Sequence, residues 1–240
     1  MRRARSLLIV LAAVTSLALG AATPRTHAQP RVDAATIAAR VQAYYDQVRS
    51  YSAEFQQTSW SRLYPQRQRS SGRVFFRKPS RFRFDYAQPA EQHYVSDGTT
   101  LQMYQAGDPG QPGQVAVVPA TESELASALP FLTGGRPLAE RFTLRLLDSR
   151  QQHFASGSVL ELTPRTPARF YDRLLLFVEG RPGLAPMVHR VLAVQPGGRL
   201  NQFDFLRASS DPARTPDSLF RYTAPPGTRR VRNLPQPAAR

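Results

Sequence analysis

The chain has no cysteine, and Lys78 is its only lysine. Without thiols it has no disulfide bonds and no cysteine nucleophile or ligand, so an exported form of it must be held together by its apolar core. All but one of its 32 basic residues are arginine, and the formal net charge is +15. These arginines are spread along the chain, which favours diffuse basicity over a dedicated nucleic-acid surface.

Catalytic motifs are also missing from the sequence. It contains no GxSxG or HExxH motif and no phosphate-binding loop. The four histidines, His27, His93, His153 and His189, are isolated from one another, and no pair of acidic residues has a metal-ligand spacing. We therefore expect no enzyme activity, no catalytic residue, no cofactor and no metal.

Long hydrophobic runs are absent too. The uncharged apolar run Leu7–Leu19 is shorter than the roughly 20 residues that cross a bilayer. Three arginines precede it and small residues follow, which predicts a secretory signal peptide over residues 1–28; an uncleaved membrane anchor is the alternative. Because no cysteine is available for lipid attachment, we expect a freely soluble periplasmic protein.

After this segment the pattern predicts one short helix. Asp33 is a suitable N-cap, and Ile37, Val41, Tyr44 and Val48 share one face of a helix that ends near Ser50.

From Tyr51 onward the period changes to that of β-strands. In the stretch "FFRKPSRFRFDY", Phe82, Phe84 and Tyr86 alternate with Arg81, Arg83 and Asp85, so the two sets lie on opposite faces of a strand. Asp97-Gly98 predicts a hairpin, and residues 106–113 an exposed loop. Thr121 and Glu124 have the spacing of a capping box before a short helix with Leu125, Leu129, Phe131 and Leu132 on its apolar face. Further strands are expected at about 114–119, 141–148, 153–163, 169–179, 187–195, 199–207 and 219–223.

These elements predict a mainly β fold with a few helices. We expect a single domain over residues 29–233, with about ten antiparallel strands in meander order, and a tail at 234–240. Such a sheet curls into a full or partial barrel because strands twist. Its aromatic face either lines a cavity or fills a solid core, and periodicity alone favours the filled core.

Several segments resemble the periplasmic outer-membrane lipoprotein carrier family, the LolA-type chaperones. They are "YSAEFQQT", "GRVFFRKPSRFRFDYAQP", "YVSDGTTLQMY", "LPFLTG", "FTLRLLDS", "LELTPR" and "FRYTAPPGTRRV". Their order and spacing cover about residues 33–233. The resemblance implies a single, strongly curved, antiparallel incomplete β-barrel in which a helical lid covers a hydrophobic cavity for acyl chains.

The resemblance also implies roles for particular residues. The cavity wall would include Phe55, Phe75, Phe82, Phe84 and Tyr94, and the lid would contribute Leu129, Phe131 and Leu132. Lys78 stands where the archetypal carrier has an arginine that closes the lid through hydrogen bonds to lid backbone. Lysine lacks the planar fork of arginine, so the lid would close less firmly; a plain surface cation is the alternative.

The implied function is that of a monomeric periplasmic carrier. It would bind the acyl chains of lipoproteins released by an ATP-driven inner-membrane exporter and deliver them to a receptor lipoprotein at the outer membrane. Three alternatives remain open: a half-barrel sensor of mislocalised lipoproteins, a carrier of another lipid, and a nucleic-acid binder that uses Arg77, Arg81 and Arg83.

Overall fold

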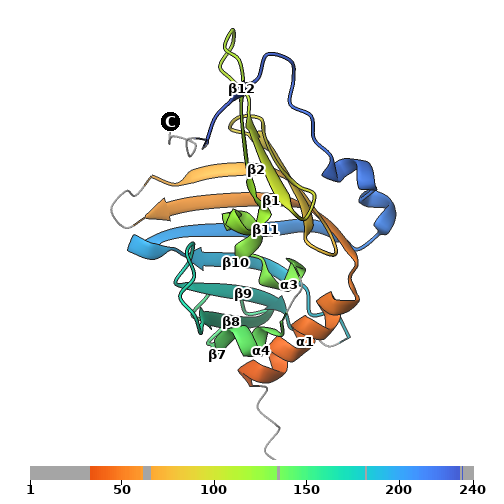
Figure 1. Ribbon diagram of the computed structural model, residues 1–240. Coiled ribbons are helices and arrows are strands. Elements are labelled where there is room, and N and C mark those ends of the chain that lie inside the picture. The colour runs from red at the N-terminus through yellow and green to blue at the C-terminus, as the bar shows by residue number, and fades with distance from the viewer. Residues whose placement is uncertain (1–32, 62–65, 134–135, 182, 233, 235–240) are drawn as a thin grey trace, which may run out of the picture. The chain divides into compact units, whose positions relative to one another are not determined.

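The structure is a computed structural model, and it describes residues 33–61, 66–133, 136–181, 183–232 and 234. The expected signal peptide and nearly all of the expected tail lie outside the described residues. The described strands form one sheet of 12 strands, in the order β12-β6-β5-β4-β3-β2-β1-β11-β10-β9-β8-β7 (Figure 1).

The strands are joined by connections that range from short turns to segments that contain short helices. They are β1 Ser50–Ser61, β2 Gln68–Arg77, β3 Arg81–Gln88, β4 Gln92–Ser96, β5 Thr100–Gln105, β6 Gln114–Pro119, β7 Phe142–Leu147, β8 Gly157–Pro164, β9 Arg173–Glu179, β10 Val188–Val194, β11 Arg199–Ser209 and β12 Arg229–Arg230. All neighbours are antiparallel except β6 and β12, which are parallel. The expected antiparallel meander is therefore confirmed for β1 to β6 and for β7 to β11.

One pairing joins these two runs of strands. The first strand, β1, lies beside β11, with Phe55 opposite Phe205 and Ser59 opposite Asn201. The sheet is curved but open, because β12 and β7 end the order instead of pairing with each other. This confirms the expected incomplete barrel and excludes a closed one.

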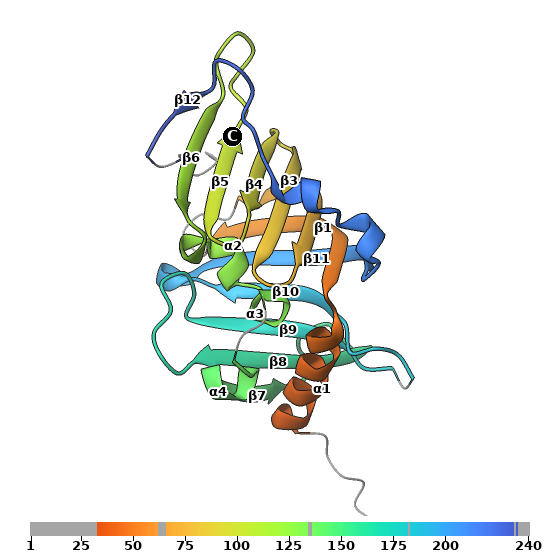
Figure 2. The ribbon, with the colours of Figure 1, turned by 45° about the vertical axis from the view of Figure 1, so that its right-hand side comes forward.

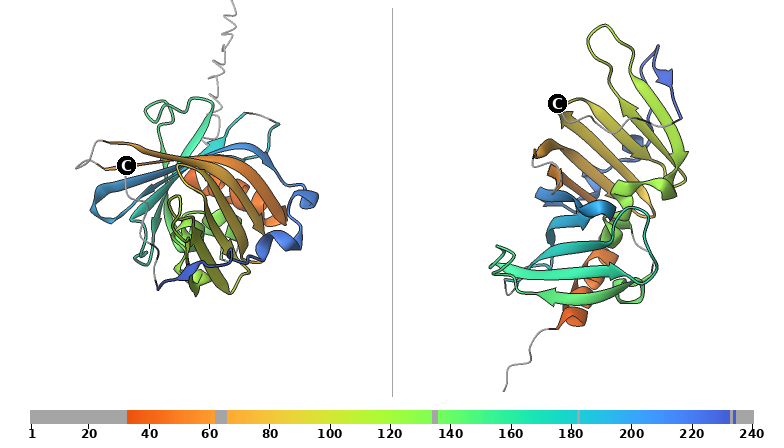
Figure 3. Two further views of the ribbon diagram at one scale, coloured as in Figure 1. Left: turned by 90° about the horizontal axis from the view of Figure 1, so that it is seen from above. Right: turned by 90° about the vertical axis from the view of Figure 1, so that its left-hand side faces the viewer.

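Short helices lie on one side of the curved sheet (Figures 2 and 3). They are α1 Ala34–Gln47, α2 Glu124–Ser127, α3 Pro130–Thr133 and α4 Leu138–Arg141. As expected, Asp33 caps α1, since its Oδ1 accepts a hydrogen bond of 2.7 Å from the backbone N–H of Thr36. We call the sheet face under these helices the concave face. Strand alternation places one set of apolar residues on this face, and a second, smaller cluster of Val159, Leu175 and Phe177 lies on the opposite face of β8 and β9.

Two expectations about local structure were wrong. Thr121 lies in a turn of 3-10 helix, Ala120–Glu122, and Ser123 is the residue that caps α2 by accepting from Ala126 N at 3.1 Å. The segment expected as a strand at 219–223 begins instead in another such turn, Asp217–Phe220. Its alternating apolar residues pack on the sheet from outside and pair with no neighbouring strand.

Among the described residues, no helix is long and apolar enough to span a membrane.

The main core is continuous from α1 across the concave face to β11, and it includes the buried residues of α3. The covering helices and the sheet are therefore parts of one apolar core.

Candidate lipid-binding site on the concave face

Aromatic rings from four neighbouring strands form a cluster on the concave face. The members of this aromatic cluster are Phe55 from β1, Phe76 from β2, Phe82 and Phe84 from β3, and Phe203 from β11. The Phe55 ring lies 5.7 Å from that of Phe84 and 6.0 Å from that of Phe203, measured between centroids. Such tilted and edge-to-face pairs are favourable for aromatic packing.

The structure places three of the expected wall residues in this cluster. Phe55, Phe82 and Phe84 are each at most 2% exposed, and the Phe84 ring packs against both of the others. In this conformation the rings fill the core, as the alternative of a solid core predicted. Tyr94 lies opposite Phe84 in the pairing of β3 with β4 and packs, partly buried, against the same core, with its ring 5.6 Å from that of Tyr86.

Phe75 was assigned to the wrong face. It lies opposite Arg83 in β3 and lines a separate hollow with Arg73 and Arg207 on the convex face of the sheet. Phe76 occupies the concave position instead, because consecutive strand residues point to opposite faces. The pair Phe75-Phe76 offers an apolar residue to either face, so periodicity could not distinguish them.

The cover is the name we give to α2 and α3, residues 124–133. Leu129, Phe131 and Leu132 are each at most 4% exposed and belong to the same core as the aromatic cluster. The Phe131 ring lies 4.7 Å from the ring of Tyr45 in α1. The cover is thus two separate four-residue helices, held by apolar contacts with the sheet and with α1.

Lys78 does not bind the backbone of the cover in the described residues. Its Nζ donates a hydrogen bond of 2.6 Å to the main-chain oxygen of Tyr45 in α1, and it lies 4.0 Å from the carboxylate of Asp46. Lys78 and Leu132 border the same small gap, so the lysine lies next to the cover. The expected bond to the lid was therefore wrong in its partner: Lys78 fastens the end of α1, and Tyr45 makes the contact with Phe131.

A partly open pocket of about 250 Å³, the mouth pocket, lies beside the aromatic cluster. Its walls come from β1 to β5 and β11 on one side and from residues 122–125 on the other. Tyr86 and Tyr94 line it together with Leu101, Met103 and Leu125. Its remaining lining is rich in amides and hydroxyls, which local sequence patterns did not indicate, because Gln57 and Asn201 meet only through the pairing of β1 with β11.

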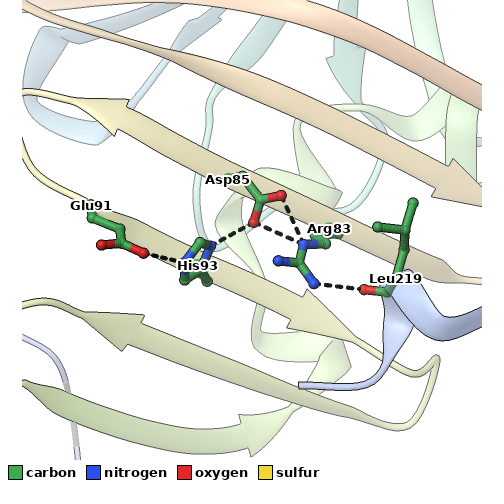
Figure 4. Close-up of polar contacts among 5 residues, drawn as sticks. All are labelled: Arg83, Asp85, Glu91, His93 and Leu219. Carbon is green, nitrogen blue, oxygen red and sulfur yellow. Dashed lines mark hydrogen bonds and ion pairs between the residues drawn. The ribbon is translucent and has the colours of Figure 1, made fainter. Parts of the chain in front are cut away.

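A polar network occupies the convex face of β3 and β4 (Figure 4). The ring nitrogens of His93 lie 2.6 Å from Asp85 and 2.9 Å from Glu91, and Arg83 Nε donates to the same Asp85 carboxylate at 2.8 Å. The hydrogen bond to Asp85 raises the pKa of His93, and burial opposes this shift. Because both nitrogens already have carboxylate partners, His93 is not free to act as a metal ligand or general base.

The same face binds the segment 212–222. Arg77 donates to the main-chain oxygen of Thr215 at 2.9 Å. Arg83 donates to that of Leu219 at 3.0 Å (Figure 4). Arg81 pairs with Asp217 at 2.7 Å. The three arginines that a nucleic-acid site would have used are therefore engaged by the chain itself.

The fold and the site define a class of protein: an open, curved, antiparallel sheet whose apolar concave face lies under short helices. The chain belongs to the family described as outer membrane lipoprotein carrier protein LolA, whose family model matches residues 46–223.

Individual relatives agree with this assignment. An outer-membrane lipoprotein carrier protein of Methylibium petroleiphilum is 30% identical over 188 residues, which cover 78% of this chain and 85% of that protein. Another, from Nitrosomonas europaea, is 24% identical over 193 residues, covering 80% of this chain and 87% of that one. A crystal structure of a LolA superfamily protein from Nitrosomonas europaea has a TM-score of 0.43 at 14% identity, and the match covers 80% of this chain and 98% of that chain.

Proposed function

We propose that this protein is a periplasmic, non-enzymatic carrier of lipoproteins. It takes up the acyl chains of lipoproteins released from the inner membrane by an ATP-driven exporter, crosses the periplasm as a monomer, and transfers its cargo to a receptor at the outer membrane. Membership of the lipoprotein carrier family and an apolar concave face under short helices support this proposal.

The observation that carries the proposal is the continuous apolar core shared by the aromatic cluster and the cover. Each methylene group buried from water contributes about 0.8 kcal/mol, so long acyl chains do not leave a membrane unaided at a useful rate. A carrier must offer a comparable apolar surface. Here that surface is the set of rings contributed by Phe55, Phe82 and Phe84 together with the underside of the cover.

Uptake requires the cover to move. The mouth pocket of about 250 Å³ is smaller than the roughly 300–1,000 Å³ of typical ligand sites. The aromatic cluster is closed over by Leu129, Phe131 and Leu132. Outward displacement of the cover would join the pocket to the space above the rings, because Leu125 of α2 is itself a wall of the pocket.

The test is release of lipoproteins from spheroplasts of a Gram-negative bacterium. We expect the purified protein to bring lipoproteins into the supernatant as a soluble complex. Met103→Glu, which puts a charge on the pocket wall, should reduce this release at least about tenfold, since burying a charge opposes binding of a chain.

The matched control is Gln102→Glu, which adds the same charge at the neighbouring position on the other face of β5. Met103 lines the pocket and Gln102 does not, so the control should release lipoproteins as the unaltered protein does. If the unaltered, folded protein brings no lipoprotein into the supernatant, the proposed function is refuted.

A further inference from the structure

The polar side of the mouth pocket is built from connected amide and hydroxyl groups. The hydroxyl of Tyr86 donates to Gln57 Oε1 at 2.8 Å, and Gln57 Nε2 donates to Asn201 Oδ1 at 2.8 Å. Ser59 Oγ also donates to Asn201 Oδ1, at 3.2 Å. Asn201 is only 6% exposed, so this is a buried polar wall and not a solvated surface.

The hydrogen bonds within this wall use its amide oxygens as acceptors. An amide oxygen accepts through two lone pairs, and the two bonds from Gln57 and Ser59 fill both on Asn201. What remains on Asn201 is the amide nitrogen with its two N–H donors. Gln92, another buried lining residue, accepts one hydrogen bond at Oε1, from the hydroxyl of Tyr94 at 2.9 Å, and its amide nitrogen also carries two N–H donors. The amide nitrogens of Asn201 and Gln92 therefore offer donors to an occupant, on a pocket wall that also contains the carboxylates of Glu122 and Glu124.

Tyr86 connects this polar wall to the aromatic cluster. Its hydroxyl belongs to the amide network, while its ring lies 4.9 Å from the ring of Phe55. Burial raises the pKa of Tyr86 well above its ordinary value, so the phenol stays neutral and donates its proton to Gln57. A ligand that passes along Tyr86 thus meets donors first and aromatic rings next.

We propose that the mouth pocket binds the neutral ester or amide linkage through which acyl chains join the polar head of the cargo. This inference rests on the proposed carrier function, since the chains themselves would extend past Tyr86 toward the aromatic cluster. A carbonyl oxygen at the start of an apolar chain is an acceptor that the amide N–H groups of Asn201 and Gln92, beside an apolar core, can pair. A plain hydrocarbon would leave these buried donors without a partner, which is unfavourable.

A pair of lipids that differ only in this carbonyl tests the inference. Glycerol monopalmitate carries an ester, and the hexadecyl ether of glycerol has the same head and nearly the same chain without the carbonyl. Each lipid would displace a fluorescent hydrophobic probe from the full protein, below the concentration at which it forms micelles. We expect the ester to bind about fivefold more tightly, as one additional hydrogen bond predicts.

Asn201→Asp is the informative variant. The carboxylate still accepts from Gln57 and Ser59, so the wall keeps its internal bonds, but it has no N–H to donate. We expect the preference for the ester over the ether to fall to about twofold or less. Gln102→Glu makes the same amide-to-acid change on the convex face and should keep the full preference.

The possible failures are distinguishable. If both lipids bind the unaltered protein equally, the proposed subsite is refuted while the carrier function stands. If Asn201→Asp folds and retains the full preference, Asn201 is not the donor. If neither lipid displaces the probe, the carrier function itself is contradicted.

Discussion

At the scale of single residues, Lys78 holds one carbonyl at the end of a helix. Its Nζ donates to the main-chain oxygen of Tyr45, and α1 has no basic residue in its last turn to meet its terminal carbonyls. A cation near a helix C-terminus is favourable because it complements the helix dipole. The resemblance to the carrier family implied that this lysine fastens the lid, whereas the structure shows it bound to Tyr45, which is distant along the chain and is brought near by the packing of α1.

Removing this amine should loosen α1. We expect Lys78→Met, which keeps an apolar stem, to lower the free energy of unfolding by about 1 kcal/mol and to speed hydrogen exchange at the end of α1. Lys78→Arg restores a donor and should recover most of the loss. Exchange at Tyr45 and Val48 that is unchanged in Lys78→Met would contradict the fastening role.

The sequence predicted the face of an aromatic side chain correctly where apolar and charged residues alternate strictly along a strand. Phe82 and Phe84 alternate with charged residues, so their face was fixed by sequence, and the structure buries both. Phe75 and Phe76 are adjacent and both apolar, so the face of each depended on the strand register. Phe203 was missed as a member of the cluster, although its alternation with Asp204 carries the same signal.

At the scale of elements, the cover is the part that the account requires to move. It consists of two four-residue helices, because Pro130 interrupts the single helix that the sequence indicated. Such short helices have little stability of their own, so their position depends on side-chain packing. Phe131, the one aromatic residue of the cover, packs its ring 4.7 Å from that of Tyr45.

Truncating this side chain should free the cover. We expect Phe131→Ala to lower the free energy of unfolding by about 3–5 kcal/mol and to speed hydrogen exchange at Leu129 and Leu132. Leu146→Ala, at a leucine that is 40% exposed, should change stability by no more than about 0.5 kcal/mol. If hydrogen exchange at Leu129 and Leu132 is as slow in Phe131→Ala as in the unaltered protein, packing against α1 does not hold the cover in place.

The segment 212–222 is attached to the sheet beside His93, and the titration of this histidine makes the stability of the fold depend on pH. It contacts the network around His93, whose ring also lies 5.3 Å from that of Tyr222 and 6.0 Å from that of Tyr104. The hydrogen bond to Asp85 raises the pKa of His93 above 6.5, the value expected when the chain is unfolded. The contribution of this hydrogen bond to the stability of the fold is therefore complete below about pH 6.5, and it is lost as pH rises through the pKa of His93 in the folded state.

Urea unfolding measured at several pH values tests the direction of this pH dependence. From about pH 6 to about pH 9, the unaltered protein should lose more stability than His93→Gln, which keeps a donor but cannot titrate. Arg83, Asp85 and Glu91 are unchanged in both proteins, so their contributions cancel to first order. Two curves that run parallel over the whole range would show that His93 does not stabilise the network through its charge.

At the scale of the whole molecule, the fold class followed from sequence but two long-range features did not. Meander order and twist predicted a curled sheet, and the resemblance to the family predicted that it stays open. The pairing of β1 with β11 and the parallel pairing of β6 with β12 join segments far apart in the chain. No local pattern encodes such partners, so the mouth pocket formed at the first of these junctions could not be predicted.

The central claim is that acyl chains occupy the concave face beneath the cover. It is tested most directly with a lipoprotein whose acyl chains carry a photoactivatable diazirine, followed by mass spectrometry of the cross-linked peptides. The account predicts cross-links to the strands that carry Phe55, Phe84 and Phe203 and to residues 129–132. Cross-links confined to the convex face, around Phe75 or Val117, would contradict it.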